Sequence, residues 1–131
     1  MTEARRDCSS FVRSLIAGLL LAAPFARGVL AQDVVKVSPE THAVLLDNAD
    51  VRVLDVRIKP GEKVAMHSHP HNVIYYLTDG ILRLTSADGK TEDRRVKAGT
   101  VVWSEASKHA AENIGPAEFR EVQIELKKAD R

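Results

Sequence analysis

The amino-acid sequence predicts an all-β protein whose strands pair in antiparallel fashion. After residue 31, short runs rich in β-branched residues recur about every eight to twelve residues, a spacing typical of β-sandwiches and β-barrels. Turn-forming residues separate these runs, and no stretch after residue 31 has a convincing helical period of 3.6 residues. We therefore expect a single sandwich or barrel.

Turn-forming pairs set the boundaries of the expected strands. Pro60-Gly61 ends the long strand that begins at Val51, and Asp79-Gly80 and Asp88-Gly89 are typical of hairpin turns. Gly115-Pro116 precedes the last strand in the same way. The expected strands cover residues 34–37, 43–46, 51–58, 63–67, 73–77, 81–85, 92–96, 100–103, 109–113 and 119–126.

Residues 1–31 have the pattern of a secretory signal peptide. Three arginines precede an apolar run over residues 15–26, and small residues follow up to Ala31, after which we expect cleavage. An uncleaved membrane anchor is the alternative, but a spanning helix needs about 20 apolar residues. Only 13 residues lie between Arg13 and Arg27. The pattern therefore predicts a periplasmic or secreted protein.

The expected mature chain, residues 32–131, is a single domain without cysteine, because Cys8 belongs to the signal peptide. Any metal ligands must then be His, Asp or Glu. The signal peptide contains four arginines and two acidic residues, which leaves 15 basic and 16 acidic residues in the mature chain. This balance favours neither nucleic acid nor an anionic membrane as a partner.

Histidines are the chemically informative residues. His67 and His69 lie two residues apart in an expected strand, so their side chains leave the same face and can converge on one metal ion. His109 begins another expected strand about forty residues later, and two close ligands with one distant ligand are typical of a metal site closed by folding. An HxH pair alone is a weak signal, because surface histidines are common.

The spacing around these histidines resembles the two motifs of the cupin superfamily. Gly61, the HxH pair at residues 67–69 and Gly80 match the spacing of the first motif, and residues 97–113 look like the second, whose histidine precedes an asparagine by four. More narrowly, the segments 67–70 and 103–106 resemble those of small stand-alone cupins, some of which carry labels linking them to β-alanine breakdown. The resemblance implies an antiparallel double-stranded β-helix, the jelly-roll barrel of cupins, with His67, His69 and His109 as metal ligands.

The sequence departs from this family pattern in two places. The glutamate of the first motif falls on Val73, and Glu105 and Ser107 replace the usual proline and glycine of the second. The resemblance thus implies three imidazole ligands for one divalent ion, namely iron, zinc, copper, nickel or manganese, with a coordination position left open. Such a site suits a metal-dependent dioxygenase or isomerase acting on a small metabolite. A non-enzymatic module that binds or senses a small ligand or metal is the alternative, and a barrel that keeps the histidines without metal is a third.

Two residues are candidates for catalytic roles beside the metal. Tyr75 has the parity of Val73, so its hydroxyl could face the pocket, with packing alone as the alternative. Glu105 precedes His109 in a loop, from which it could reach a ligand histidine or the open position; a solvated loop acid is the alternative. We expect a small-molecule ligand and, because strand edges are exposed, a homodimer.

Four further residues have expected structural roles. Pro70 interrupts the strand, so His71 is either a loop residue or a group close to the metal. His42 is expected to be solvated or satisfied in the core, and Trp103 to lie in the core rather than to serve as a platform for substrate. Asn113 is expected to hold the backbone of the turn that follows it.

Overall fold

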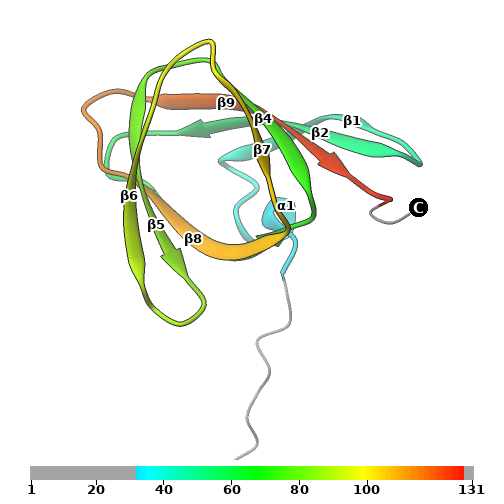
Figure 1. Ribbon diagram of the computed structural model, residues 1–131, viewed down its shortest axis with the longest axis horizontal. Coiled ribbons are helices and arrows are strands. Elements are labelled where there is room, and N and C mark those ends of the chain that lie inside the picture. The colour runs from blue at the N-terminus through cyan, green and yellow to red at the C-terminus, as the bar shows by residue number, and fades with distance from the viewer. Residues whose placement is uncertain (1–31, 129–131) are drawn as a thin grey trace, which may run out of the picture.

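The computed structural model describes residues 32–128, so the expected signal peptide and its cleavage site lie outside the described residues. One short helix precedes the strands, which surround a common interior (Figure 1). The elements are α1 (Val34–Val37), β1 (His42–Asp47), β2 (Val51–Ile58), β3 (Lys63–His69), β4 (Asn72–Tyr76), β5 (Gly80–Ser86), β6 (Thr91–Val96), β7 (Val101–Ser104), β8 (Ser107–Asn113) and β9 (Phe119–Leu126).

The strands form two antiparallel sheets. The order is β1-β2-β9-β4-β7 in the five-stranded sheet and β3-β8-β5-β6 in the four-stranded sheet. Strands distant in sequence are neighbours: β2 pairs along its whole length with β9, and β3 pairs with β8. This arrangement is a double-stranded β-helix, so the predicted fold class is confirmed.

One expected strand is wrong. Residues 34–37 form a single helical turn because Asp33 caps it: its Oδ1 accepts a hydrogen bond from the backbone N–H of Val35 at 2.9 Å. The backbone N–H of Ser38 donates to the carbonyl of Val34, whose side chain is fully buried. Burial of Val34 and the cap together override the preference of valine for strands.

The apolar core lies between the two sheets. Its buried members come from both sheets and from α1, and they are Val34, Leu54, Val56, Ile58, Val64, Tyr76, Leu82, Ala111 and Phe119. Gly80 packs directly against this core, because a Cβ placed there would lie 2.7 Å from Cδ2 of Phe119. Gly61 has a φ of 75°, a left-handed conformation that glycine adopts without steric cost.

Asn113 fixes the turn between β8 and β9, as expected. Its Oδ1 accepts from the N–H of Gly115 at 2.9 Å, and its Nδ2 donates to the carbonyls of Ile58 and Ala117, both at 2.8 Å. The side chain is fully buried, so these bonds satisfy polar atoms that would otherwise be costly to bury. Asn113 thereby connects the ends of β2 and β8.

Within residues 32–128, the helix is too short and insufficiently apolar to cross a membrane.

Candidate metal centre

A β-bulge places the HxH pair inside the barrel. Between the pairs Val64–Ala111 and His67–His109, β3 contains one residue more than β8. The extra residue changes which positions of β3 face inward, so that Val64, His67 and His69 are all buried. The bulge therefore aims both histidines into the interior, and His109 lies directly opposite His67 in the register.

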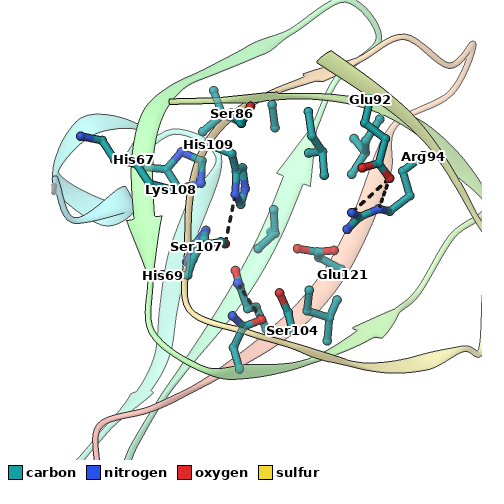
Figure 2. A pocket seen from close by; sticks show the side chains of 18 of the residues that line it. His67, His69, Ser86, Glu92, Arg94, Ser104, Ser107, Lys108, His109 and Glu121 are labelled. Atoms are coloured by element: carbon teal, nitrogen blue, oxygen red, sulfur yellow. Dashed lines mark hydrogen bonds and ion pairs between the residues drawn. The ribbon is translucent and has the colours of Figure 1, made fainter. Parts of the chain in front are cut away.

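The three predicted ligands form one cluster. One ring nitrogen from each of His67, His69 and His109 lies within 4.8 Å of the others. The ring centroids are 4.6 Å apart for His67 and His69, 4.7 Å for His67 and His109, and 5.5 Å for His69 and His109. His67 and His69 are buried and His109 is half-buried at the cavity (Figure 2). The cluster has the ligand number of an open divalent-metal site.

The Nδ1 atom of each clustered histidine already has a protein partner. Nδ1 of His67 lies 2.6 Å from the carbonyl of Ala65, a group that can only accept, so this nitrogen donates its proton. Nδ1 of His69 lies 2.7 Å from Oε1 of Glu125, and Nδ1 of His109 lies 3.3 Å from Oγ of Ser107. Nε2 is therefore the nitrogen left for a metal, and histidine ligands commonly have their other nitrogen fixed in this way.

Burial favours the neutral form of His67 and His109, which is the form that metal ligation requires. Loss of solvation lowers the pKa of His67 to about 4, with a contribution from neighbouring His69. Loss of solvation likewise lowers the pKa of His109 to about 3, with further contributions from His67 and His69. Three imidazole nitrogens in one cluster fit a divalent ion of the borderline class, such as zinc, iron or copper.

Glu125, which sequence reasoning missed, connects the cluster to the rest of the barrel. Its Oε1 holds His69, and its Oε2 accepts from Nε of Arg52 at 2.6 Å. Arg52 also bonds Oδ2 of Asp33, the residue that caps α1, at 2.7 Å. Burial alone would raise the pKa of Glu125, but the hydrogen bonds from His69 and Arg52 outweigh burial and lower that pKa. An ionised carboxylate thus orients His69.

A cavity of about 620 Å³ opens beside the histidines. Its walls include Leu82, Ile58 and Phe119, and polar groups lie at several points around them. Such a mixture of apolar walls and few polar groups is typical of small-molecule sites. Figure 2 shows His67, His69 and His109 on one side of this cavity and Glu121 and Arg94 on the other.

Comparison with known proteins identifies the family. The sequence profile of the cupin domain matches residues 54–124, which contain all three clustered histidines. The chain belongs to the cupin domain family. Within this family it is 35% identical over 86 residues to the β-alanine degradation protein BauB of Pseudomonas aeruginosa, a match that covers 64% of this chain and 90% of BauB.

Solved structures agree with this assignment. This cupin resembles a cupin domain from Bordetella pertussis with 29% identity and a TM-score of 0.62, over 66% of this chain and 92% of the other. It also resembles a Klebsiella pneumoniae protein with a double-stranded β-helix domain, with 23% identity and a TM-score of 0.51, over 67% and 84% of the two chains. At 23% identity, the likeness to the Klebsiella pneumoniae protein shows only that the two chains share a fold.

The expected orientation of Tyr75 in this cupin is wrong. Tyr75 is 41% exposed and lies outside the cavity lining, whereas Tyr76 is buried and lines the cavity. Tyr75 does share the parity of Val73, but the side chains of β4 that line the cavity are those of Asn72, Ile74 and Tyr76, so the row that contains Val73 and Tyr75 faces away from it. The side chains of β4 that face the cavity begin with Asn72 rather than Val73. No carboxylate of this strand therefore faces the three clustered histidines.

Glu105 does not contact the clustered histidines. Its Oε1 accepts from Nε1 of Trp103 at 2.7 Å, and its Oε2 lies 2.9 Å from Nε2 of His71. His71 also stacks on Trp103, with ring centroids 5.8 Å apart, so it lies outside the metal cluster. Trp103 is 54% exposed, which corrects its expected place in the core. These three residues form a surface cluster near the cavity mouth.

His42 is buried in the core with a hydrogen-bond partner, which is one of the two environments expected for it. Its position beside His67 and His69 was not expected from the sequence. It is buried in β1, its Nδ1 lies 2.8 Å from Oγ1 of Thr41, and its ring centroid lies 5.9 Å from that of His67 and 6.3 Å from that of His69. Loss of solvation, assisted by His69 and His67, lowers the pKa of His42 to about 3. His42 therefore adds a fourth imidazole to the cavity wall, outside the cluster of three.

Proposed function

We propose that this cupin binds one divalent metal ion through His67, His69 and His109 and carries out a metal-dependent oxidation or isomerisation of a small metabolite. The observation that supports this most directly is the set of three clustered imidazoles whose Nδ1 atoms are all engaged by the protein. A site held in this manner needs little reorganisation to accept an ion.

The chain itself would bind and orient the reactant. A divalent ion bound at the three imidazoles would supply Lewis acidity to an oxygen of the reactant. The apolar walls of the cavity would exclude water from this region, and Asn72 and Gln123, which hydrogen bond to each other at 3.2 Å, offer amide groups to a polar substituent. The relative associated with β-alanine degradation supports a small metabolite as the reactant.

Elemental analysis tests the metal proposal. Protein purified from cells that express the full chain should contain about one divalent ion per chain, and His67→Ala should contain far less. His71→Ala is the matched control, because His71 contacts Glu105 and Trp103 rather than the cluster, and it should retain the wild-type amount. Sub-stoichiometric metal that is equal in wild type and His67→Ala would overturn the proposal.

Oxygen uptake tests the proposed chemistry. Iron(II)-loaded protein would be screened against thiols, diketones and flavonoid-like compounds, and against hydroxy acids for isomerisation without oxygen uptake. Turnover that is lost in His109→Ala but retained in His71→Ala is the expected result. Metal binding with no turnover in either screen would favour the second candidate function.

The second candidate is a module that binds a small ligand or senses metal without catalysis. The observation in its favour is that Asn72 and Ile74, rather than a carboxylate, line the cavity on β4. The missing acidic ligand removes a charged donor that could also accept a proton from a reactant.

We further propose that the protein is exported. N-terminal sequencing of the exported product should find that it begins at Gln32.

A further inference from the structure

Glu121 is a buried carboxyl group that forms no hydrogen bond to any described residue, although the charge of Arg94 acts on it. Its side chain projects from β9 into the cavity and is only 8% exposed. Within residues 32–128, no hydrogen bond or ion pair engages its oxygens. An unpaired acid in such a place is costly, so its retention in a cavity wall indicates a function that involves a ligand.

Three groups surround this carboxyl. Tyr76 of β4 pairs with Glu121 in the register and is itself buried, and Arg94 of β6 lines the same cavity. On the other side, Val56 of β2 pairs with Glu121 and brings no charge. Arg94 contacts Glu92 at 3.3 Å, but Glu92 is largely exposed, so that ion pair is weak and Arg94 remains able to bind an anion.

The protonation of Glu121 decides which ligand this cluster favours. Burial raises the pKa of Glu121 to about 8, although Arg94 opposes the rise. Burial also raises the pKa of Tyr76, and the charge of Glu121 adds to that effect. At neutral pH the cluster therefore contains a carboxylic acid, a phenol and a guanidinium, all of which donate hydrogen bonds, and only the guanidinium is charged.

We propose that Glu121, Arg94 and Tyr76 form a subsite for the carboxylate of a small organic acid. The ligand carboxylate would accept hydrogen bonds from the three side chains, and its hydrocarbon part would lie against Leu82 and Phe119. In Figure 2, Glu121 and Arg94 of this subsite face the three clustered histidines across the cavity, so a second oxygen-bearing group of the same ligand would point toward the histidines. The subsite shares its cavity with the proposed function but requires no metal.

Binding of hexanoate to the full-length protein tests the subsite. Titration would be followed by NMR shifts of the backbone amides in metal-free and zinc-loaded protein, with hexanamide and hexylamine as neutral and cationic comparisons. Hexanoate should bind at least about tenfold more tightly than hexylamine at pH 6.5. Glu121→Ala and Arg94→Gln should each weaken hexanoate binding about tenfold, whereas Arg95→Gln, one residue along β6 and absent from the cavity lining, should leave it unchanged.

Glu121→Gln separates a binding role from a structural one. Glutamine retains a donor but cannot ionise, so hexanoate affinity at pH 6.5 should remain within about threefold of wild type. Wild-type affinity should fall about tenfold between pH 6.5 and pH 9.5, as the Glu121 carboxylate forms and repels the ligand, and Glu121→Gln should not show this fall. This variant also keeps the test valid if Glu121→Ala fails to fold.

Three results would overturn the subsite. These are no hexanoate binding to wild type, equal binding by wild type and both weakening variants, and tighter binding of hexylamine than hexanoate that depends on Glu121. Failure of the metal proposal can be told apart from failure of the subsite, because the two have separate measurements. His67→Ala should lose metal but should still bind hexanoate in the absence of metal. Hexanoate binding by a wild type that holds no metal would contradict the proposed function alone.

Discussion

Oε1 of Glu125 lies 2.7 Å from Nδ1 of His69, while Oε2 of the same carboxylate accepts a hydrogen bond from Arg52. A charged acceptor raises the basicity of the histidine and fixes its orientation, and loss of such a partner typically costs 10- to 100-fold in metal affinity. Glu125 thus stands in the same relation to a metal ligand as the carboxylate partners found in many zinc sites.

Glu125→Gln should therefore weaken zinc binding about 10- to 100-fold, because glutamine can accept from His69 but carries no negative charge. Competition with a fluorescent chelator measures the affinity. Glu118→Gln, an acid-to-amide change at an exposed residue, should leave the affinity unchanged. Equal affinities for wild type and Glu125→Gln would show that the carboxylate does not support the metal site.

Glu121 gives the stability of the metal-free protein an unusual pH dependence. Its folded pKa of about 8 lies above the ordinary glutamate value of 4.5, so ionisation is more costly in the folded state than in the unfolded state. The cost appears as the pH rises above about 4.5 and is complete above about 8. Glu121→Gln should remove it, and so gain on the order of 3 kcal/mol relative to wild type between pH 5 and pH 7.5.

Urea denaturation of both proteins at the two pH values measures this difference. Glu112→Gln, which changes a half-buried acid that lies 3.9 Å from Lys63, should show no comparable gain. If the free energies of unfolding of wild type and Glu121→Gln differed by the same amount at both pH values, Glu121 would already be ionised at pH 5 in the folded protein, or it would be paired with another group of the protein.

The pairing of His67 and His69 in the histidine cluster was predictable because it depends on local spacing. Residues two apart in a strand share a face in any fold, so His67 and His69 could be paired before the topology was known. The bulge that turns both of them inward could not be predicted, since it shows only in the register of β3 against β8. His109 was found through the spacing of the family motif, not through strand parity.

The polar lining of the cavity was not predictable from the sequence. Along β9, Val122, Ile124 and Leu126 alternate with Glu121, Gln123 and Glu125, a pattern in which the apolar row would ordinarily be assigned to the interior. The structure places the polar row inside and leaves the apolar row half-buried. The inversion arises because the interior contains a cavity lined by polar side chains and the three clustered histidines. The inward position of Phe119, on the same row, is the one signal in the strand that opposes the ordinary assignment.

Acid should destabilise the metal-free protein through the clustered histidines. The folded pKa of His109, about 3, lies below the ordinary histidine value of 6.5, so the unfolded chain binds the proton more readily. The stability contributed by neutral His109 is present above about pH 6.5 and is lost as the pH falls toward 3. Between pH 7 and pH 5 the loss should be on the order of 2 kcal/mol for this residue.

Free energies of unfolding in the presence of a chelator, at pH 7 and pH 5, measure this loss. His109→Asn should make the decrease smaller by the stated amount. A decrease of the same size in wild type and His109→Asn would show that His109 takes up protons equally in the folded and unfolded states between these pH values.

The outer face of the five-stranded sheet has the properties that the expected homodimer requires. Val101 is 62% exposed and pairs with Tyr75, which is 41% exposed, while Trp103 is 54% exposed and pairs with Val73. Side chains of paired residues lie side by side on one face of a sheet, so these form a continuous apolar surface. Apolar surfaces of this kind commonly mark interaction sites, and a second copy could cover the same face by two-fold symmetry.

Sedimentation velocity should therefore find the wild type as a dimer and Val101→Glu as a monomer, because a buried glutamate pair at a two-fold interface would be strongly unfavourable. Arg95→Glu introduces the same side chain on β6 in the other sheet and should remain dimeric. The metal content of Val101→Glu should equal that of wild type, since Val101 lies outside the cavity lining and none of the three clustered histidines is on β7. A monomeric wild type, or a dimer that persists in Val101→Glu, would exclude this face as the interface.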